Sequence, residues 1–123
     1  MNLDRKTRGE LAYAQGHAAE ESVEKYYRAR GATPLERRWR GSGGEIDLIF
    51  RQGDTVVCVE VKSSSNFEAA AASLSERQVH RLLLAAEEFC GTLPKGSLTP
   101  LRFDVALVDR RGSVRVLEAA ITA

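Results

Sequence analysis

The amino-acid sequence predicts an α/β fold in which helices flank a mixed sheet, with elements in the order α-β-β-β-α-β-β. Two segments carry apolar residues at helical spacing, and the runs between and after them alternate apolar and polar residues as strands do. Turns that contain glycine separate these segments. The 123 residues fit one domain, and no internal repeat indicates a second.

The N-terminal part of the chain predicts a tail followed by a long helix. Residues 1–8 are polar and aperiodic, so we expect a flexible tail there and a single domain over residues 9–123. From Glu10 to Arg30 apolar residues recur at helical spacing, and Gly31 suits the position that follows a helix.

The next segments predict three strands, two of which form a hairpin. A short strand over Leu35–Arg40 ends at the glycine-rich break formed by residues 41–44. The β-rich runs Glu45–Arg51 and Thr55–Lys62 follow, with a tight turn at Gly53-Asp54 between them. This is the clearest hairpin pattern in the chain.

The second half of the chain predicts a loop, a helix and two further strands. Residues 63–67 are polar and typical of a loop. Ser75 and Gln78 have the spacing of a capping box, which opens an amphipathic helix. Alternating residues then predict strands over Leu101–Val108 and Ser113–Ala119.

Composition and charge exclude several classes of protein. Lys and Arg number 18 and Asp and Glu number 17, so the formal charge of +1 excludes a polybasic protein that binds polyanions through bulk charge. No run approaches the roughly 20 apolar residues that a membrane span needs. Cys58 and Cys90 lack metal-binding spacing and are expected to be buried, reduced thiols. We therefore expect a cytoplasmic protein with no membrane segment.

The hairpin brings acidic residues and a lysine onto facing strands. If its turn is a two-residue loop of type II′, the numbers of paired residues sum to 107. Asp47 then lies opposite Glu60, and Glu45 lies opposite Lys62. Opposed Cβ atoms in a sheet stand about 4.5–5.5 Å apart, so the first two carboxylates are close enough to hold one ion.

Alternation along the hairpin also predicts which side chains share a face. In the first strand, Ile46, Leu48 and Phe50 are expected on the face opposite Asp47. In the second strand, Glu60 is expected to point away from the flanking valines.

Two facing carboxylates repel each other, so this arrangement needs a partner. A divalent cation removes the repulsion, and Mg²⁺ prefers oxygen ligands while keeping positions for water and a substrate phosphate, with Mn²⁺ as a substitute. Such an ion polarises a phosphoryl oxygen and activates water, and a nearby lysine stabilises the charge of the transition state. The alternative is a solvated face on which Glu–Lys pairs serve stability alone.

Several motifs resemble the YraN-like family of small bacterial proteins. They are Gly16–Glu20 with its HAAE segment, Trp39-Arg40, Gly44–Ile49 (GEIDLI), Val59–Lys62 (VEVK) and Arg102–Val105 (RFDV), and the resemblance covers nearly the whole chain. That family is in turn similar to the PD-(D/E)XK nuclease superfamily and to archaeal Holliday-junction resolvases.

The resemblance implies a restriction-endonuclease-like core and a role for five residues. Asp47 and Glu60 become catalytic residues and metal ligands, with the backbone carbonyl of Val61 as a further ligand. Lys62 becomes the catalytic lysine, and Glu20 on the first helix becomes the carboxylate that completes the site. Resolvase-like relatives act as dimers, so the resemblance also implies a homodimer.

Arginines are the candidates for nucleic-acid binding. Arg38 and Arg40 are expected on one face of their strand, where guanidinium groups can contact phosphates. Trp39 is expected on the other face, where a core position is favoured over base stacking. Arg77 and Arg81 lie near one face of the second predicted helix and extend the same set.

One acidic residue outside the hairpin is interpreted as structural. Asp104 interrupts the apolar alternation of its strand, and an aspartate in such a setting needs a cationic partner. Arg102 is the nearest candidate in the sequence.

These observations predict a metal-dependent endonuclease that hydrolyses DNA phosphodiester bonds, with branched or single-stranded DNA as candidate substrates. The alternative is a non-catalytic nucleic-acid-binding or protein-interaction module on a nuclease-like fold. A third reading is a structural domain in which the carboxylates only form salt bridges, and its stability would then be indifferent to divalent ions.

Overall fold

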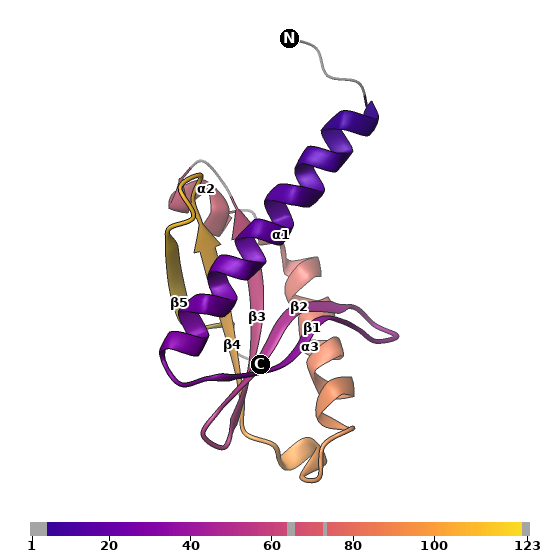
Figure 1. Ribbon diagram of the computed structural model, residues 1–123. Helices are drawn as coiled ribbons and strands as arrows, with labels where there is room; N and C mark the ends of the chain where they lie inside the picture. Colours follow the sequence, from indigo (N-terminus) through magenta and orange to yellow (C-terminus); the bar gives the residue numbers. More distant parts are fainter. Residues whose placement is uncertain (1–4, 64–65, 73, 122–123) are drawn as a thin grey trace.

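Five strands form one sheet in the computed structural model, which describes residues 5–63, 66–72 and 74–121 (Figure 1). The helices are α1 (Arg5–Ala29), α2 (Phe67–Ala72), α3 (Glu76–Cys90) and the 3₁₀ helix η1 (Gly96–Leu98). The strands are β1 (Thr33–Arg40), β2 (Glu45–Gln52), β3 (Thr55–Ser63), β4 (Leu101–Val108) and β5 (Val114–Ile121). The strand order is β1-β2-β3-β4-β5, and only β3 and β4 run parallel. This mixed sheet with flanking helices confirms the predicted α/β fold, and it is consistent with a restriction-endonuclease-like core.

Helices cover both faces of the sheet, which makes three layers (Figure 1). On one face, Val23 and Tyr27 of α1 pack in a cluster with Leu48, Phe50 and other buried residues of β2, β3 and β4. On the opposite face, α3 packs on a second cluster, and Phe67 of α2 joins it. The alternation of β3 therefore divides its side chains between two apolar layers, as expected for a strand that is buried on both faces.

The first helix begins earlier than the sequence predicts. It starts at Arg5 and so includes residues 5–8 of the segment expected to be a tail, while residues 1–4 lie outside the described part. Arg and Lys are good helix formers, and they extend the helix without adding to its apolar periodicity. At the other end, Gly31 has a φ of +86°, the left-handed conformation expected after a helix.

The second half follows the predicted order with two additions, α2 and the 3₁₀ helix η1. Ser75 caps α3 as expected: its Oγ accepts the Gln78 backbone N–H at 3.2 Å, and Gln78 Oε1 accepts the Ser75 N–H at 3.0 Å. The short helix α2 lies where the sequence predicts no element, because six alanine-rich residues give too little periodicity to indicate one.

The β2–β3 hairpin has the predicted register. Gln52 pairs with Thr55, and the paired numbers sum to 107 as far as Leu48 and Val59. Gly53 has a φ of +61°, which the first central residue of a type II′ turn requires. The turn chemistry therefore fixes the alignment of the two strands over this region.

The alternation of β2 side chains between the two faces of the sheet fails at Asp47, although the sequence predicts that it continues. Ile46 packs with Ile49 in the cluster beneath α3, whereas Leu48 and Phe50 pack in the cluster beneath α1. The expected grouping of Ile46 with Leu48 and Phe50 is therefore wrong. The regular β2–β3 pairing also ends at Leu48, so Asp47 is not held in a regular pair opposite Glu60.

A matching irregularity lies on the neighbouring strand. Arg38 of β1 has a φ of +48°, an uncommon conformation for a residue with a side chain. Its side chain and that of Arg37 both reach carboxylates on α1, whereas Trp39 packs edge-to-face on Phe89 of α3 with ring centroids 5.5 Å apart. The core position predicted for Trp39 is confirmed, but strict alternation along β1 is wrong because the backbone turns at Arg38.

Cys58 and Cys90 are both buried free thiols, and burial raises the pKa of Cys58 to about 12. Within the residues described above, no helix is both long and apolar enough to span a membrane.

Candidate functional site

The two carboxylates singled out in the sequence meet where β2 and β3 stop pairing regularly. Asp47 Oδ2 accepts the backbone N–H of Val61 at 2.9 Å, so the aspartate crosses to β3 through its side chain. Its carboxyl group lies close enough to that of Glu60 for the charge of Asp47 to raise the pKa of Glu60. Lys62 Nζ lies 3.6 Å from Glu60 Oε1. The three predicted residues are thus brought together, although by a different local geometry from the one expected.

This cluster is shielded from water. The side chains of Glu60 and Lys62 are only 14% and 18% exposed. Burial raises the pKa of Glu60 to about 8, and the nearby charge of Asp47 raises it further while Lys62 opposes the rise. Burial also raises the pKa of Asp47, against the hydrogen bond from Val61. At neutral pH the pair therefore retains a proton that an isolated pair of carboxyl groups in water would release.

We expect Glu60→Gln to stabilise the metal-free protein at pH 8. The folded-state pKa of Glu60 is raised above its unfolded value, so wild-type stability falls as pH rises from about 4.5 to about 8. Each pKa unit corresponds to about 1.4 kcal/mol, and the gain should reach a few kcal/mol at pH 8 and vanish near pH 4. Urea unfolding at several pH values in EDTA measures this.

The control for this comparison is Glu36→Gln, a change at an exposed glutamate of β1. Wild-type protein should also gain stability from Mg²⁺ at pH 8, because an ion that binds only the folded state stabilises it. Equal pH dependence in wild type and Glu60→Gln would contradict the expectation.

Glu20 approaches the same cluster from α1. Its side chain is 15% exposed, and its two carboxylate oxygens lie 3.0 and 3.2 Å from Arg38 Nε, which donates to them. Burial raises the pKa of Glu20, Arg38 opposes the rise, and the charge of Asp47 adds to it. Glu20 is therefore close enough to Asp47 for the charge of Asp47 to raise the pKa of Glu20. In this structure, however, the Glu20 carboxylate is held by Arg38.

The donor set fits a hard divalent cation such as Mg²⁺. Among the described residues, no three His, Cys, Asp or Glu side chains form a group that could hold a metal by themselves. Mg²⁺ does not require such a group, since it is commonly bound by one or two carboxylates with water and substrate oxygens in the other positions. Asp47 and Glu60 supply two carboxylates that are shielded from water and repel each other. A bound cation would compensate their charge.

The candidate nucleic-acid-binding arginines fall into two settings. Arg38 is held against Glu20, and Arg40 lies 3.0 Å from Glu45 in an exposed ion pair. Arg77 and Arg81 are exposed on α3, one turn apart.

Glu45 is paired with Arg40 on the neighbouring strand β1. The expected position of Glu45 opposite Lys62 is wrong, because the regular pairing of β2 with β3 ends at Leu48.

Glu88 of α3, which no sequence pattern singles out, holds the glycine-rich loop between β1 and β2. Glu88 Oε2 accepts the Ser42 backbone N–H at 2.8 Å, and its Oε1 accepts the Ser42 hydroxyl at 3.1 Å. A glutamate on the exposed side of a helix has no local pattern that indicates such a contact 46 residues away along the chain.

Comparison with known proteins identifies the family. The model of the uncharacterised protein family UPF0102 matches residues 19–108. A UPF0102 protein of Ruegeria pomeroyi is 55% identical over 114 residues, which cover 93% of each chain. A UPF0102 protein of Cereibacter sphaeroides is 50% identical over 115 residues, 94% of this chain and 98% of the relative. A third, of Roseobacter denitrificans, is 47% identical over 93% of this chain and 88% of its own. The chain belongs to the UPF0102 family, the YraN-like family that its motifs resemble.

Proposed function

We propose that this protein is a metal-dependent endonuclease that hydrolyses phosphodiester bonds in DNA. The observation that supports this most directly is the shielded cluster of Asp47, Glu60 and Lys62. Two half-buried carboxylates without a matching pair of cations are unfavourable for stability, and such arrangements are typical of functional sites.

Each residue of the cluster has a proposed role. Asp47 and Glu60 would hold Mg²⁺, together with the Val61 carbonyl, and Mn²⁺ would substitute for it. When bound, the ion would polarise the scissile phosphate and lower the pKa of a water molecule. Lys62 would orient that water or stabilise the negative charge of the transition state. Glu20 would assist if its carboxylate were released from Arg38.

The proposed substrate is branched or single-stranded DNA, held through phosphate contacts. Arg38, Arg40, Arg77 and Arg81 are the proposed contacts, because a near-neutral chain needs local cationic groups to bind a polyanion. We further propose that the protein acts in the cytoplasm as a homodimer. The cytoplasmic location accords with its two free cysteines, and the homodimer with the resemblance to resolvases.

Incubation with Mn²⁺ or Mg²⁺ and a panel of linear, single-stranded, flapped and four-way DNA tests the proposal. Wild-type protein should cleave at least one of these substrates, and Asp47→Asn should not, although it should remain folded. Asp54→Asn in the exposed β2–β3 turn is the matched control and should keep full activity. Undiminished cleavage by Asp47→Asn would overturn the proposal.

A non-catalytic nucleic-acid-binding module is the second candidate. It is favoured by the ion pair between Glu20 and Arg38, which keeps the third carboxylate away from a metal. This alternative predicts salt-sensitive DNA binding without cleavage, equal in wild type and Asp47→Asn, and unaffected by divalent cations.

A further inference from the structure

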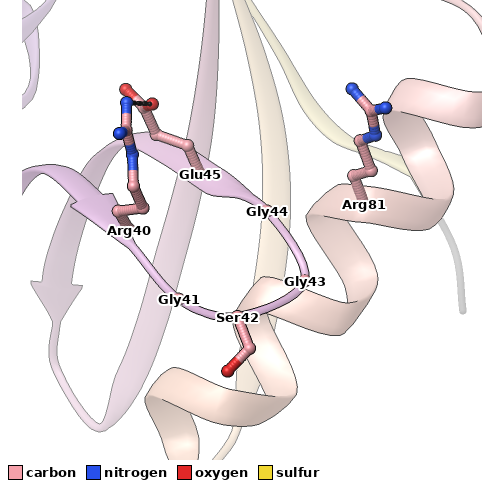
Figure 2. Close-up of a pocket in the computed structure, with 7 residues that line it drawn as sticks. All are labelled: Arg40, Gly41, Ser42, Gly43, Gly44, Glu45 and Arg81. Atoms are coloured by element: carbon pink, nitrogen blue, oxygen red, sulfur yellow. Dashed lines mark hydrogen bonds and ion pairs between the residues drawn. The ribbon is translucent and has the colours of Figure 1, made fainter.

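A pocket of about 410 Å³ lies between the β1–β2 loop and α3 (Figure 2). Residues 40–45 and Arg81 line it. Figure 2 shows that the side chains of Arg40 and Arg81 stand on either side of the loop and extend in the same general direction, whereas Ser42 points the opposite way. A pocket of this size accommodates a small group such as a phosphate with its sugar, but not a folded partner.

The loop is held closely against α3. Glu88 accepts both the backbone N–H and the hydroxyl of Ser42, and Gly41 donates its N–H to the Gly44 carbonyl at 2.9 Å. A Cβ added at Gly44 would lie 2.8 Å from the backbone carbonyl oxygen of Arg81, so a side chain there would push the loop off the helix. The close packing therefore requires glycine at this position and fixes the distance between the loop and Arg81.

The groups that face the pocket favour an anion. Two guanidinium groups oppose one carboxylate, and that carboxylate, Glu45, pairs with Arg40 in an exposed position. Arg81 forms no ion pair with any residue that the structure describes. In that same part of the chain, the N–H groups of Gly43 and Gly44 donate to no acceptor. Free backbone N–H groups beside guanidinium groups are a common arrangement for binding phosphate.

The pocket lies next to the carboxylate cluster. Glu45 lines the pocket and precedes Asp47 by two residues on β2, about 7 Å along an extended strand. Its charge also contributes to the raised pKa of Asp47. A single nucleic-acid strand advances about 3.4 Å per nucleotide along a helix axis, so the separation corresponds to one or two nucleotide steps.

We propose that this pocket binds one backbone phosphate of the nucleic acid, one or two nucleotides from the bond to be cleaved, through Arg81, Arg40 and the N–H groups of Gly43 and Gly44. The proposal rests on the proposed nuclease function for its choice of ligand. The pocket would fix the position of the strand, so that the neighbouring phosphate lies at Asp47 and Glu60.

Binding of a labelled single-stranded oligonucleotide in EDTA, measured by fluorescence anisotropy over a range of salt concentrations, tests this proposal. Arg81→Gln should weaken binding about 3- to 10-fold and reduce the slope of log K against log salt by about 0.7, the loss of one phosphate contact. Arg110→Gln removes the same charge from the exposed β4–β5 turn, across the sheet, and should change neither quantity. Equal effects of the two substitutions would overturn the proposal, and so would the absence of binding at low salt.

A second measurement locates the phosphate. In amide NMR spectra, inorganic phosphate should shift the Gly43 and Gly44 signals of the wild type and not those of Arg81→Gln, and unmoved glycine signals would overturn the proposal. Cleavage is scored separately. If Arg81→Gln weakens binding while the wild type fails to cleave DNA, the phosphate pocket stands and the nuclease proposal fails. If the wild type cleaves while Arg81→Gln and Arg110→Gln bind alike, the nuclease proposal stands and the phosphate pocket fails.

Discussion

Replacing Lys62 with alanine is expected to reduce metal-dependent DNA cleavage at least about 10²- to 10³-fold, the typical effect of removing one group that stabilises transition-state charge. Lys62 is the cation 3.6 Å from Glu60, and its side chain is 18% exposed, so it acts in a region that water screens weakly. Its removal also leaves the repulsion between Asp47 and Glu60 without a nearby positive charge.

Single-turnover cleavage with enzyme in excess measures this effect apart from substrate binding. Lys95→Ala, which changes an exposed lysine in the connection before β4, is the matched control and should cleave at the wild-type rate. Thermal unfolding with and without Mg²⁺ shows whether Lys62→Ala still folds and binds metal. A folded Lys62→Ala variant that cleaves within a few-fold of the wild-type rate would exclude the proposed role of Lys62.

Replacing Asp104 with alanine is expected to destabilise the protein by about 3–5 kcal/mol, the usual result of removing one partner from a buried ion pair. Asp104 on β4 is completely buried. Its oxygens accept hydrogen bonds from Tyr27 Oη at 2.6 Å, from Arg102 Nε and Nη2 at 2.9 and 3.0 Å, and from the Ala119 backbone N–H at 3.0 Å. The single carboxylate thus joins α1, β4 and β5.

The truncation would leave several donors unsatisfied at once. The Tyr27 hydroxyl would lose its acceptor in a buried setting, and burial together with Asp104 already raises the pKa of Tyr27. The partly exposed Arg102 guanidinium would keep only Gln52 Oε1 at 3.3 Å and Glu118 Oε1 at 4.0 Å. Ala119 has a φ of +50°, and the β4–β5 pairing shifts beside it, so this strained turn of the strand would lose its support.

Urea unfolding of three variants measures the contribution of this network. Tyr27→Phe removes one hydrogen bond and keeps the stacking of the ring on Phe50, so it should cost only about 0.5–1.5 kcal/mol. Asp54→Ala, at an exposed aspartate in the hairpin turn, should change stability by less than about 0.5 kcal/mol. A loss below about 1 kcal/mol for Asp104→Ala would show that the network contributes little.

Local sequence patterns determined much of the architecture. The capping box at Ser75 and the register of the β2–β3 hairpin follow from contacts within a few residues, so a single sequence contains the information for both. The pairing of Asp104 with Arg102 could be anticipated in the same way, because the two residues are neighbours on one strand. The meeting of Asp47 with Glu60 followed from the turn at Gly53, since the turn length fixes the distance of each residue from the end of the hairpin.

The detailed arrangement of the site depended on the tertiary structure. The pattern of the chain predicts regular pairing through Asp47, whereas the side chain of Asp47 takes the place of a strand partner at Val61. Alternation places Arg38 with Arg40, but a left-handed backbone conformation turns Arg38 toward Glu20 on α1. The turn of Arg38 has no local signal, because Glu20 comes near only when α1 packs on the sheet. The contact between Asp47 and Val61 lies within the hairpin, but regular alternation gives no indication of it.

In the β1–β2 loop, too, local sequence predicts the element, while contacts with a distant part of the chain give it its structure. Its glycines indicate a break in the sequence, and a break is all that local rules predict. In the folded protein Glu88 of α3 binds Ser42 and turns that break into one wall of a pocket. The sequence alone therefore determined the fold and the identity of the central carboxylates, through periodicity and turn chemistry. Only the tertiary structure decided that Arg37 and Arg38 pair with Glu24 and Glu20, because those pairs join β1 to α1, two elements that local sequence does not relate.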